Sequence, residues 1–254
     1  MLRGLLRPRW ILIHVGVIAL VVLMMNLGFW QLRRLDEKRT FNAKVTARSE
    51  MPVDDLTRVF TKADDLTVMG LEWRRVRVTG TYDFGRAVRV VNRSQDGAAG
   101  YDEVVPLQTK EFGWVIVNRG FVPLAVTLTD SHPQEPVTVT GYLKLSQQRG
   151  VLGAVDSTDI TNKDFQRFDI PLMAKQLNGT VFPMYVQLTG ETPATIKEWP
   201  APVAFPELSE GPHKSYAIQW FFFCLVALTA WVVVTRRKWR AGDVVTPPTP
   251  DRKS

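Results

Sequence analysis

The sequence predicts an α+β membrane protein in which two transmembrane helices flank an extracytoplasmic β-rich domain of about six strands, arranged as a meander or a barrel-like sheet. Two apolar runs near the ends of the 254-residue chain predict the helices. Alternating apolar and polar residues between the runs predict the strands. The formal charge of +7 supports this division. Residues 31–215 hold 23 Lys/Arg and 23 Asp/Glu, so the excess comes entirely from the ends.

This charge distribution excludes nucleic acid as a partner. A nucleic-acid module needs clustered basic charge on its folded surface to displace counterions. Here the central stretch is neutral, and the basic residues lie beside the two apolar runs. Membrane lipid is therefore the partner that the charges predict, because basic flanks anchor and orient transmembrane helices.

The first apolar run, Trp10 to Trp30, is 21 residues long and has no formal charge. At about 1.5 Å per residue, a helix of this length crosses the hydrocarbon core of a bilayer. We expect the helix to continue through about Ala47. A buried core helix and a cleaved signal peptide are the alternatives. The run exceeds the usual apolar stretch of a signal peptide, and Leu27-Gly28-Phe29-Trp30 offers no small-residue cleavage site.

The second run, Tyr216 to Thr235, is 20 residues long and also carries no charge. A basic cluster follows it at once, whereas only Lys214 immediately precedes it. The positive-inside rule therefore places both termini in the cytoplasm. Because only nine residues precede the first run, leaving no room for a transit peptide, we expect a bacterial plasma membrane. The predicted segments are a cytoplasmic N-terminus over 1–9, transmembrane helices over 10–31 and 213–235, the β-rich domain over 32–212, and a basic, then disordered, cytoplasmic tail over 236–254.

The central domain is predicted from period-two patterns and turn signals. Residues 75–82 and 137–145 alternate between apolar and polar, which indicates strands with one buried face. Further strands are predicted over 86–93, 101–109, 113–119 and 184–189, and a helix over 170–177 that ends at Asn178-Gly179. The single cysteine, Cys224, lies in the second run, so the domain can form neither a disulfide nor a Cys-x-x-Cys site.

No catalytic motif is present, and we expect no enzyme. The sequence lacks His-Glu-x-x-His, Gly-x-Ser-x-Gly and Gly-rich phosphate-binding patterns. The acidic pairs 54–55, 64–65 and 102–103 are interpreted as solvated surface charge. His132 is predicted to be a solvated loop residue. His14, inside the first run, is expected to be solvated at the interface or to pair with a neighbouring helix. Asn118-Arg119-Gly120 is predicted to be a structural turn whose arginine pairs with an acid.

Two segments at the predicted membrane boundary have unusual composition. They are Leu27-Gly28-Phe29-Trp30-Gln31-Leu32-Arg33-Arg34 at the end of the first run, and residues 211–221 at the start of the second. On a 3.6-residue period, one helix face contains Leu27, Trp30, Gln31 and Arg34, and the other contains His213, Tyr216, Ala217 and Trp220. Both faces are expected at similar depth, so together they can form one site.

These segments resemble a known family. Leu-Gly-x-Trp-Gln-Leu-x-Arg and His-x-x-Tyr-Ala-x-Gln-Trp are similar to motifs of the Surfeit-locus-one family of cytochrome c oxidase assembly factors, as is Val117-Asn118-Arg119-Gly120-Phe121-Val122-Pro123. The resemblance covers roughly residues 20–235. It implies a two-span protein of the respiratory chain that acts in the maturation of subunit I of an aa3-type cytochrome c oxidase, as a chaperone that holds or delivers haem a.

With that resemblance, we expect His213 to ligate haem iron, since neutral imidazole is a good axial ligand. Trp30, Tyr216 and Trp220 are the expected walls, Gln219 and Gln31 the polar orienting groups, and Arg34 or Lys214 the partners of the propionates. The alternative assigns His213 to the helix start, the tryptophans to an interfacial belt and Arg34 to snorkelling. A cofactor-free interaction protein, bound to the oxidase or to other subunits of a respiratory supercomplex, therefore remains the second functional hypothesis.

Overall fold

The computed structural model describes residues 8–60, 65–128, 135–194, 196 and 198–242, which form two compact units. The helical unit is residues 1–43 with 208–254, and the sheet unit is residues 44–207. The elements, in chain order, are α1 (Pro8–Ser49), β1 (Asp54–Asp55), α2 (Leu56–Phe60), α3 (Asp65–Leu71), β2 (Arg75–Tyr82), η2 (Phe84–Arg86), β3 (Val88–Gln95), β4 (Ala98–Thr109), β5 (Gly113–Pro123), β6 (Val137–Leu145), β7 (Asp164–Phe165), α4 (Ile170–Met173), η3 (Ala174–Gln176), β8 (Val181–Thr192) and α5 (His213–Gly242).

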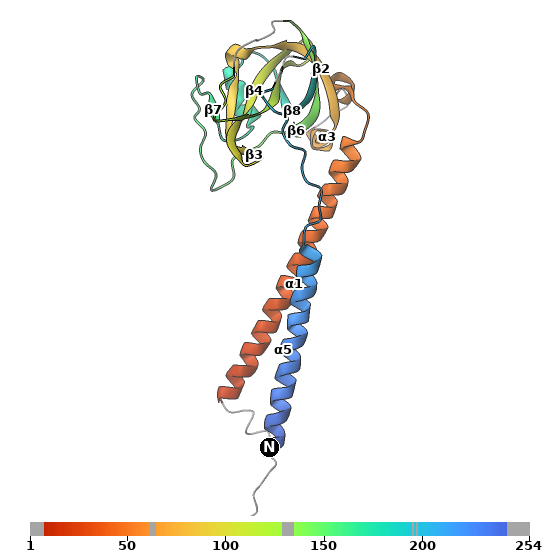
Figure 1. The fold of residues 1–254 in the computed structure, drawn as a ribbon, viewed down its shortest axis with the longest axis vertical. Coiled ribbons are helices and arrows are strands. Elements are labelled where there is room, and N and C mark those ends of the chain that lie inside the picture. Colours follow the sequence, from red (N-terminus) through yellow and green to blue (C-terminus); the bar gives the residue numbers. More distant parts are fainter. Residues whose placement is uncertain (1–7, 61–64, 129–134, 195, 197, 243–254) are drawn as a thin grey trace, which may run out of the picture. The chain divides into compact units, whose positions relative to one another are not determined.

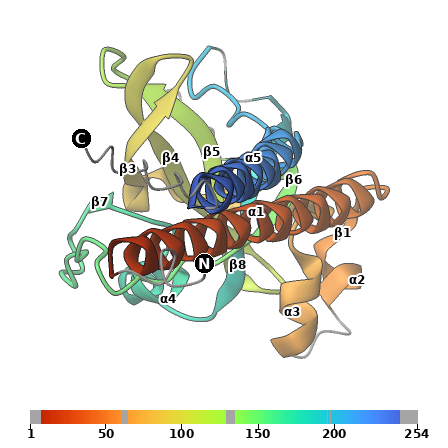
Figure 2. The same ribbon diagram turned by 90° about the horizontal axis from the view of Figure 1, so that it is seen from below.

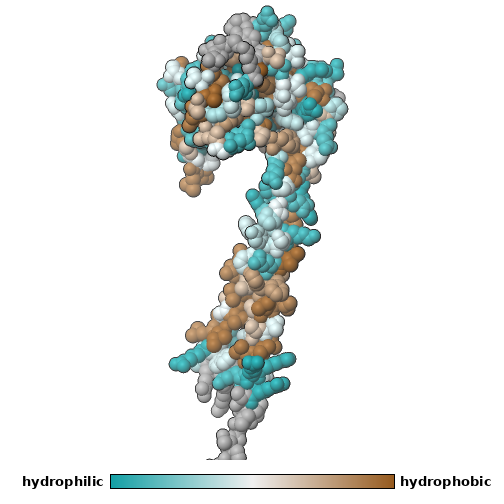
Figure 3. All heavy atoms as spheres, viewed as in Figure 1, coloured by the Kyte–Doolittle hydropathy of each residue, from teal (hydrophilic) through white to brown (hydrophobic). Residues whose placement is uncertain are grey.

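The helical unit consists of α5 and most of α1, which lie side by side in Figures 1 and 2. Both helices are long and apolar enough to cross a membrane, and only 11 % of the most apolar window of each is buried. Apolar side chains, brown in Figure 3, gather on one long stretch of this face of the helical pair. Leu12 is 71 % exposed and Leu225 is 62 % exposed. Two candidate spans thus flank a sheet-rich domain, which is consistent with a membrane protein. The predicted continuation of the first helix to about residue 47 is confirmed.

The sheet unit contains one eight-stranded sheet with the order β1-β2-β6-β8-β5-β4-β3-β7. The six longer strands match the six predicted segments, and β1 and β7 are short additions of two residues each. The predicted meander is wrong, because β8 lies between β6 and β5 and runs parallel to β5. β2 also pairs with β4, but only at Thr81 and Tyr82. The sheet is therefore not a clear barrel.

The pattern of buried and accessible residues along each strand follows from the position of that strand in the sheet. β2 and β6 alternate between buried and accessible residues, as the period-two pattern predicts. β5 lies in the interior and is buried along nearly its whole length, which explains its continuous apolar run. β3 and β4 are joined by Asp96-Gly97, both with positive φ. The turn is shorter than the sequence suggests, because β4 already begins at Ala98.

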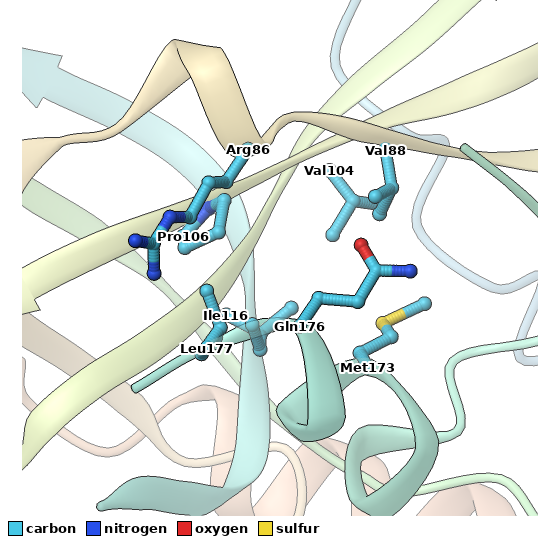
Figure 4. A pocket seen from close by; sticks show the side chains of 8 residues that line it. All are labelled: Arg86, Val88, Val104, Pro106, Ile116, Met173, Gln176 and Leu177. Carbon is cyan, nitrogen blue, oxygen red and sulfur yellow. The ribbon is translucent and has the colours of Figure 1, made fainter. Parts of the chain in front are cut away.

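Two apolar clusters form the core of the sheet unit. Consecutive residues of β8 contribute to different clusters: Val186 belongs to the first and Tyr185 to the second. The second cluster includes Ile170 and Met173 of α4, which confirms the helical segment predicted before Asn178-Gly179. Figure 4 shows the residues lining a cavity beside α4. Its volume is about 10 Å³, so it has room for about one water molecule and for no cofactor.

The interpretation of Asp102-Glu103 as solvated charge is wrong. Both side chains are buried, as are Asn118 and Arg119 on the paired strand β5. Nη1 of Arg119 donates to Glu103 at 2.8 Å, so the arginine does pair with an acid. The Asn118-Arg119-Gly120 segment lies within β5, at a bulge opposite Glu103 and Val104, and is not a turn. Asp64 and His132 lie outside the described residues.

The last turn of α1 belongs to the sheet unit and packs against it. Val45 is fully buried. Glu72 accepts hydrogen bonds from Lys44 at 3.4 Å and from Lys144 at 2.9 Å. The Lys144 ammonium also lies 3.3 Å from the ring centroid of Trp73. Burial lowers the pKa of Lys144, although Glu72 opposes this shift. One carboxylate therefore joins the last turn of α1 to β6.

Candidate functional site

The two helices meet along a seam that repeats every seven residues in α1. Its members in α1 are His14, Val21, Gly28, Leu35 and Asn42, of which Val21, Gly28 and Leu35 are buried. α5 contributes Ala217 and Cys224, which are 1 % and 7 % exposed. A seven-residue repeat is typical of helices that pack at a small crossing angle. The seam therefore places His14 opposite Trp231 of α5, and Asn42 beside the chain that precedes α5.

Gly28 is the point of closest approach in this seam. A Cβ atom at Gly28 would lie 2.7 Å from the ring of Phe221, which has no room for it. The Phe221 ring also packs edge-on against Phe29, with 5.4 Å between centroids. A small residue in a helix interface lets the partner approach closely. Gly28 thus sets the spacing of the helices one turn before Gln31.

His213 and Gln31 meet at one end of the seam, as the sequence predicts for two members of the site. Nδ1 of His213 lies 2.8 Å from Oε1 of Gln31. An amide oxygen can only accept a hydrogen bond, so in this arrangement Nδ1 carries the proton. In the neutral imidazole, Nε2 then keeps its lone pair. The ring is half-buried, at the first residue of α5, directly after Pro212 and Gly211.

His14 occupies the opposite end of the seam and has the opposite tautomer. The indole Nε1 of Trp231 donates to Nδ1 of His14 at 2.9 Å, and the two rings pack edge to face. Because Nδ1 accepts this bond, the proton of the neutral ring lies on Nε2. The expected pairing of His14 with a neighbouring helix is confirmed. As arranged, this imidazole presents an N–H rather than a lone pair at its free edge.

The other predicted site residues lie around this pair but do not converge on it. Trp30 and Tyr216 are 50 % and 48 % exposed, so both rings project from the seam. Trp220 is half-buried and packs edge-on against Phe223. The remaining three, Gln219, Arg34 and Lys214, are exposed, and Arg34 pairs with Glu37 at 2.8 Å. The structure thus joins His213 to Gln31 and leaves the aromatic and basic residues on the outer surface of the helices.

Beyond His213 the seam continues with polar contacts. Arg39 donates two hydrogen bonds to Glu210, at 2.7 and 2.9 Å, and Nδ2 of Asn42 donates to the carbonyl of Leu208 at 2.9 Å. The hydrogen bond from Arg39 lowers the pKa of Glu210 from its ordinary value of 4.5. A bidentate pair fixes the direction of both side chains. These contacts therefore hold the chain before α5 against α1 and position the helix start at His213.

Sequence reasoning missed most of the seam, although a signal was present. The seven-residue spacing from His14 to Asn42 is visible in the sequence, but the apolar residues on every other face conceal it. The partners Trp231, Phe221 and Glu210 could not be assigned, because nothing in the sequence fixes the register of two distant helices.

Within the described residues, no group of three or more His, Cys, Asp or Glu side chains is arranged to hold a metal ion.

The comparisons cover nearly the whole chain. The model of the SURF1 family matches residues 18–225. A SURF1-like protein of Rickettsia conorii is 27 % identical over 237 residues, covering 88 % of this chain and 90 % of the relative. A SURF1-like protein of Mycobacterium tuberculosis is 27 % identical over 267 residues, covering 98 % and 92 %. Surfeit locus protein 1 of Gallus gallus is 22 % identical over 236 residues, covering 85 % and 73 %. Since the match runs from within α1 through the sheet domain and into α5, the chain belongs to the SURF1 family.

Proposed function

We propose that this protein is an assembly factor for cytochrome c oxidase that holds or delivers haem a to subunit I at the extracytoplasmic face of a bacterial plasma membrane. The family is known in general as a family of oxidase assembly factors. The contact between His213 and Gln31 is the observation that carries the haem proposal. In this proposal α1 and α5 span the membrane, both termini are cytoplasmic, and the sheet domain is outside.

The chemistry of His213 suits an axial ligand. When bound, haem a would supply an iron atom that takes a neutral imidazole nitrogen. The hydrogen bond to Gln31 leaves Nε2 as the donor atom and fixes the ring orientation. Metal-ligating histidines almost always donate their other N–H in this way. Gln31 is therefore proposed as the positioning residue and His213 as the ligand.

The surrounding residues support a transient site. Trp30 and Tyr216 present exposed aromatic surface for a flat macrocycle, and Lys214 is an exposed cation near His213 in the sequence. Arg34 is engaged by Glu37, so Lys214 is the better proposed partner of a propionate. A single axial ligand on an open surface suits a carrier that must release its cargo to subunit I.

The tautomer of His14 argues against a haem site at the other end of the seam. Its Nδ1 accepts from Trp231, which leaves a protonated Nε2. Ligation there would require this hydrogen bond to break. The two histidines thus form a matched pair for an experiment: both lie in the seam and both have a hydrogen-bonded Nδ1, but one is suited to iron and the other is not.

The test is the absorption spectrum of the full chain, purified in mild detergent from cells that make haem a. We expect a haem a Soret band in the wild type, at least a tenfold loss in His213→Ala, and retention in His14→Ala. Gln31→Leu should shift the band or weaken retention, because the ring loses its orientation. A colourless protein that co-purifies with oxidase would favour the cofactor-free interaction protein. Loss of haem in His14→Ala but not in His213→Ala would overturn the assignment of the ligand.

A further inference from the structure

The sheet domain contains a polar cavity that the proposed haem chemistry does not use. Its volume is about 200 Å³. Side chains from β3, β4, β5 and β8 line it, together with residues of the loops before β7 and after it and of the segment that follows β8. The lining residues are Arg93, Ser94, Gln95, Asp102, Asn118, Phe121, Gln147, Phe168, Tyr185, Gln187 and Val203.

The fold directs unusually polar side chains into this cavity. Asn118 and Gln187 are register partners on the parallel strands β5 and β8, and both are buried. Asp102, on β4, accepts a long hydrogen bond from Nδ2 of Asn118 at 3.3 Å. Buried polar groups are nearly always hydrogen-bonded in folded proteins. Yet the Gln187 side chain, which is 8 % exposed, makes no hydrogen bond within the described part of the chain.

Arg93 and Asp102 provide opposite charges that are not closely joined. Nε of Arg93 lies 3.5 Å from Oδ2 of Asp102, and among the described residues this buried Nε has no hydrogen-bond partner. Burial raises the pKa of Asp102, against the effects of Arg93 and Asn118, so the carboxyl group is poorly solvated. β3 is irregular between Val90 and Arg93, and Asn92 has a φ of 59°. Such bulges re-aim side chains and are common beside binding sites.

Two stacked aromatic rings line part of the cavity. The rings of Phe168 and Tyr185 stack at 4.2 Å with an interplanar angle of 9°. The Arg93 guanidinium lies 5.5 Å from the Phe168 centroid. A chain segment after β8 lies beside these groups: Phe121 pairs with Ala201, and Gln95 bonds with Pro202 and Ala204. The donors and acceptors around the cavity favour a polar group that can both accept and donate hydrogen bonds.

These observations select the class of ligand. The Asp102 carboxylate would repel a simple anion, and the Arg93 guanidinium would repel a simple cation. An apolar group would leave the Gln187 amide and Nε of Arg93 without hydrogen-bond partners, which is unfavourable for buried groups. A planar amide has an acceptor on one side and a donor on the other. Its oxygen can accept from Arg93 or Gln187, and its N–H can donate to Asp102.

We propose that this cavity binds an amide group of a protein partner, either the carboxamide of an asparagine or glutamine side chain or a main-chain peptide group. The site is distinct from His213 and does not depend on haem binding. A partner would insert one residue into the cavity.

The test adds three model compounds, one at a time, to the full chain in detergent. The protein is labelled with ¹⁵N-glutamine, so that the side-chain amides of its glutamines can be followed by NMR. The compounds are N-acetylglutamine methylamide, its glutamate isostere, and N-acetylglycine methylamide. We expect the glutamine compound to bind with a dissociation constant of about 1 mM, as for a small fragment, and to shift the side-chain signals of Gln187, Gln147 and Gln95. The exposed Gln108 and Gln219 are internal controls whose signals should not move. If the side-chain carboxamide is the ligand, the glutamate compound should bind at least tenfold more weakly; if the main-chain peptide group is the ligand, all three compounds should bind alike.

The glycine compound distinguishes the two sources of the amide. Equal affinity for the glycine and glutamine compounds would assign the main chain, whereas a tenfold preference for glutamine would assign the side chain. Gln187→Leu should weaken binding at least tenfold, and Gln108→Leu should not. The proposal is overturned if neither amide compound moves the signal of Gln187 at millimolar concentration in the folded wild type. It is also overturned if the glutamate compound binds as well as the glutamine compound while the glycine compound binds tenfold more weakly, or if Gln187→Leu leaves the affinity unchanged in a protein with native near-ultraviolet circular dichroism.

Discussion

The helical pair exposes apolar side chains over most of its surface and joins its two helices through small residues and a few polar contacts. The sheet domain does the reverse: it encloses its apolar residues in two clusters and keeps most charges outside. This difference is consistent with water around the sheet domain and lipid around the helical pair. In water, apolar burial stabilises the sheet. Between helices in lipid, apolar burial gives no such stabilisation, so close packing and hydrogen bonds have to hold the helices together.

The comparison shows that hydrogen-bonded polar groups have different roles in the two regions. In the helical pair they define register: His14 bonds to Trp231, and Gln31 bonds to His213. In the sheet domain, Arg119 lies between Glu103 and Glu191, at 2.8 and 3.7 Å, where it compensates two buried carboxylates. Substitutions in the first region should therefore change helix pairing, and substitutions in the second should change the stability of the domain.

The largest effect is expected for Arg119→Met in the sheet domain. Removing the guanidinium leaves buried carboxylates without a compensating charge, which typically lowers the free energy of unfolding by about 3–5 kcal/mol. Urea unfolding of the full chain, followed by near-ultraviolet circular dichroism, measures the loss. Arg77→Met is the matched control, since its pair with Asp55 is exposed and should contribute at most about 1 kcal/mol. Equal losses in the two variants would contradict the role assigned to Arg119.

A smaller loss is expected for Gly120→Ala at the β5 bulge. Gly120 has a φ of +140°, and an added Cβ would lie 2.2 Å from the carbonyl oxygen of Ala201. The strained backbone and the clash should lower the free energy of unfolding by about 1–3 kcal/mol, measured by the same urea titration. Gly190→Ala in β8 meets no atom within 4 Å and serves as control. If Gly120→Ala unfolded at the wild-type urea concentration, the contact with Ala201 would be wrong.

In the helical pair, Gly28→Val should separate the helices with little effect on the sheet domain. The new side chain would occupy the space of the Phe221 ring, and overpacking of this kind opposes association by about 1–3 kcal/mol. Spin labels on exposed residues of α1 and α5 should show a longer and broader distance distribution by pulsed electron resonance. Gly16→Val is the control in the same helix, because nothing lies within 4 Å of that position. If the distance distribution in Gly28→Val were the same as in the wild type, the close approach of the two helices at Gly28 would be contradicted.

The smallest effect concerns the exposed pair of Arg39 and Glu210. The pKa of Glu210 is lowered in the folded protein, so the pair contributes stability that is present above the ordinary value of 4.5 and is lost as the pH falls through the lowered pKa. Arg39→Gln should raise the pKa of Glu210 toward 4.5, which an NMR titration of its carboxyl carbon would detect. A titration curve identical to that of the wild type would show that the pair does not form in solution.

The sequence by itself determined the long elements of this protein, namely the two apolar helices and the six longer strands. Uncharged runs of 20 residues or more specify helices long enough to cross a membrane, because backbone groups in lipid must bond within their own segment. Alternation over 75–82 and 137–145 specified strands with one buried face, and both are confirmed as β2 and β6. The sequence also predicts His213 and Gln31 as members of one site, since both lie near the ends of the two runs, and their side chains are in contact.

Only the tertiary structure decided which elements are neighbours. β8 pairs in parallel with β5 and antiparallel with β6, although no local pattern encodes either partner. That placement buries Gln187 beside Asn118 and forms the polar cavity. Asp102 and Glu103, which the sequence alone assigned to the surface, are buried in the same sheet. The physical reason is that a strand's burial depends on what covers each of its faces, and contacts between distant segments decide this. The tautomers of His14 and His213 depend in the same way on partners in the opposite helix.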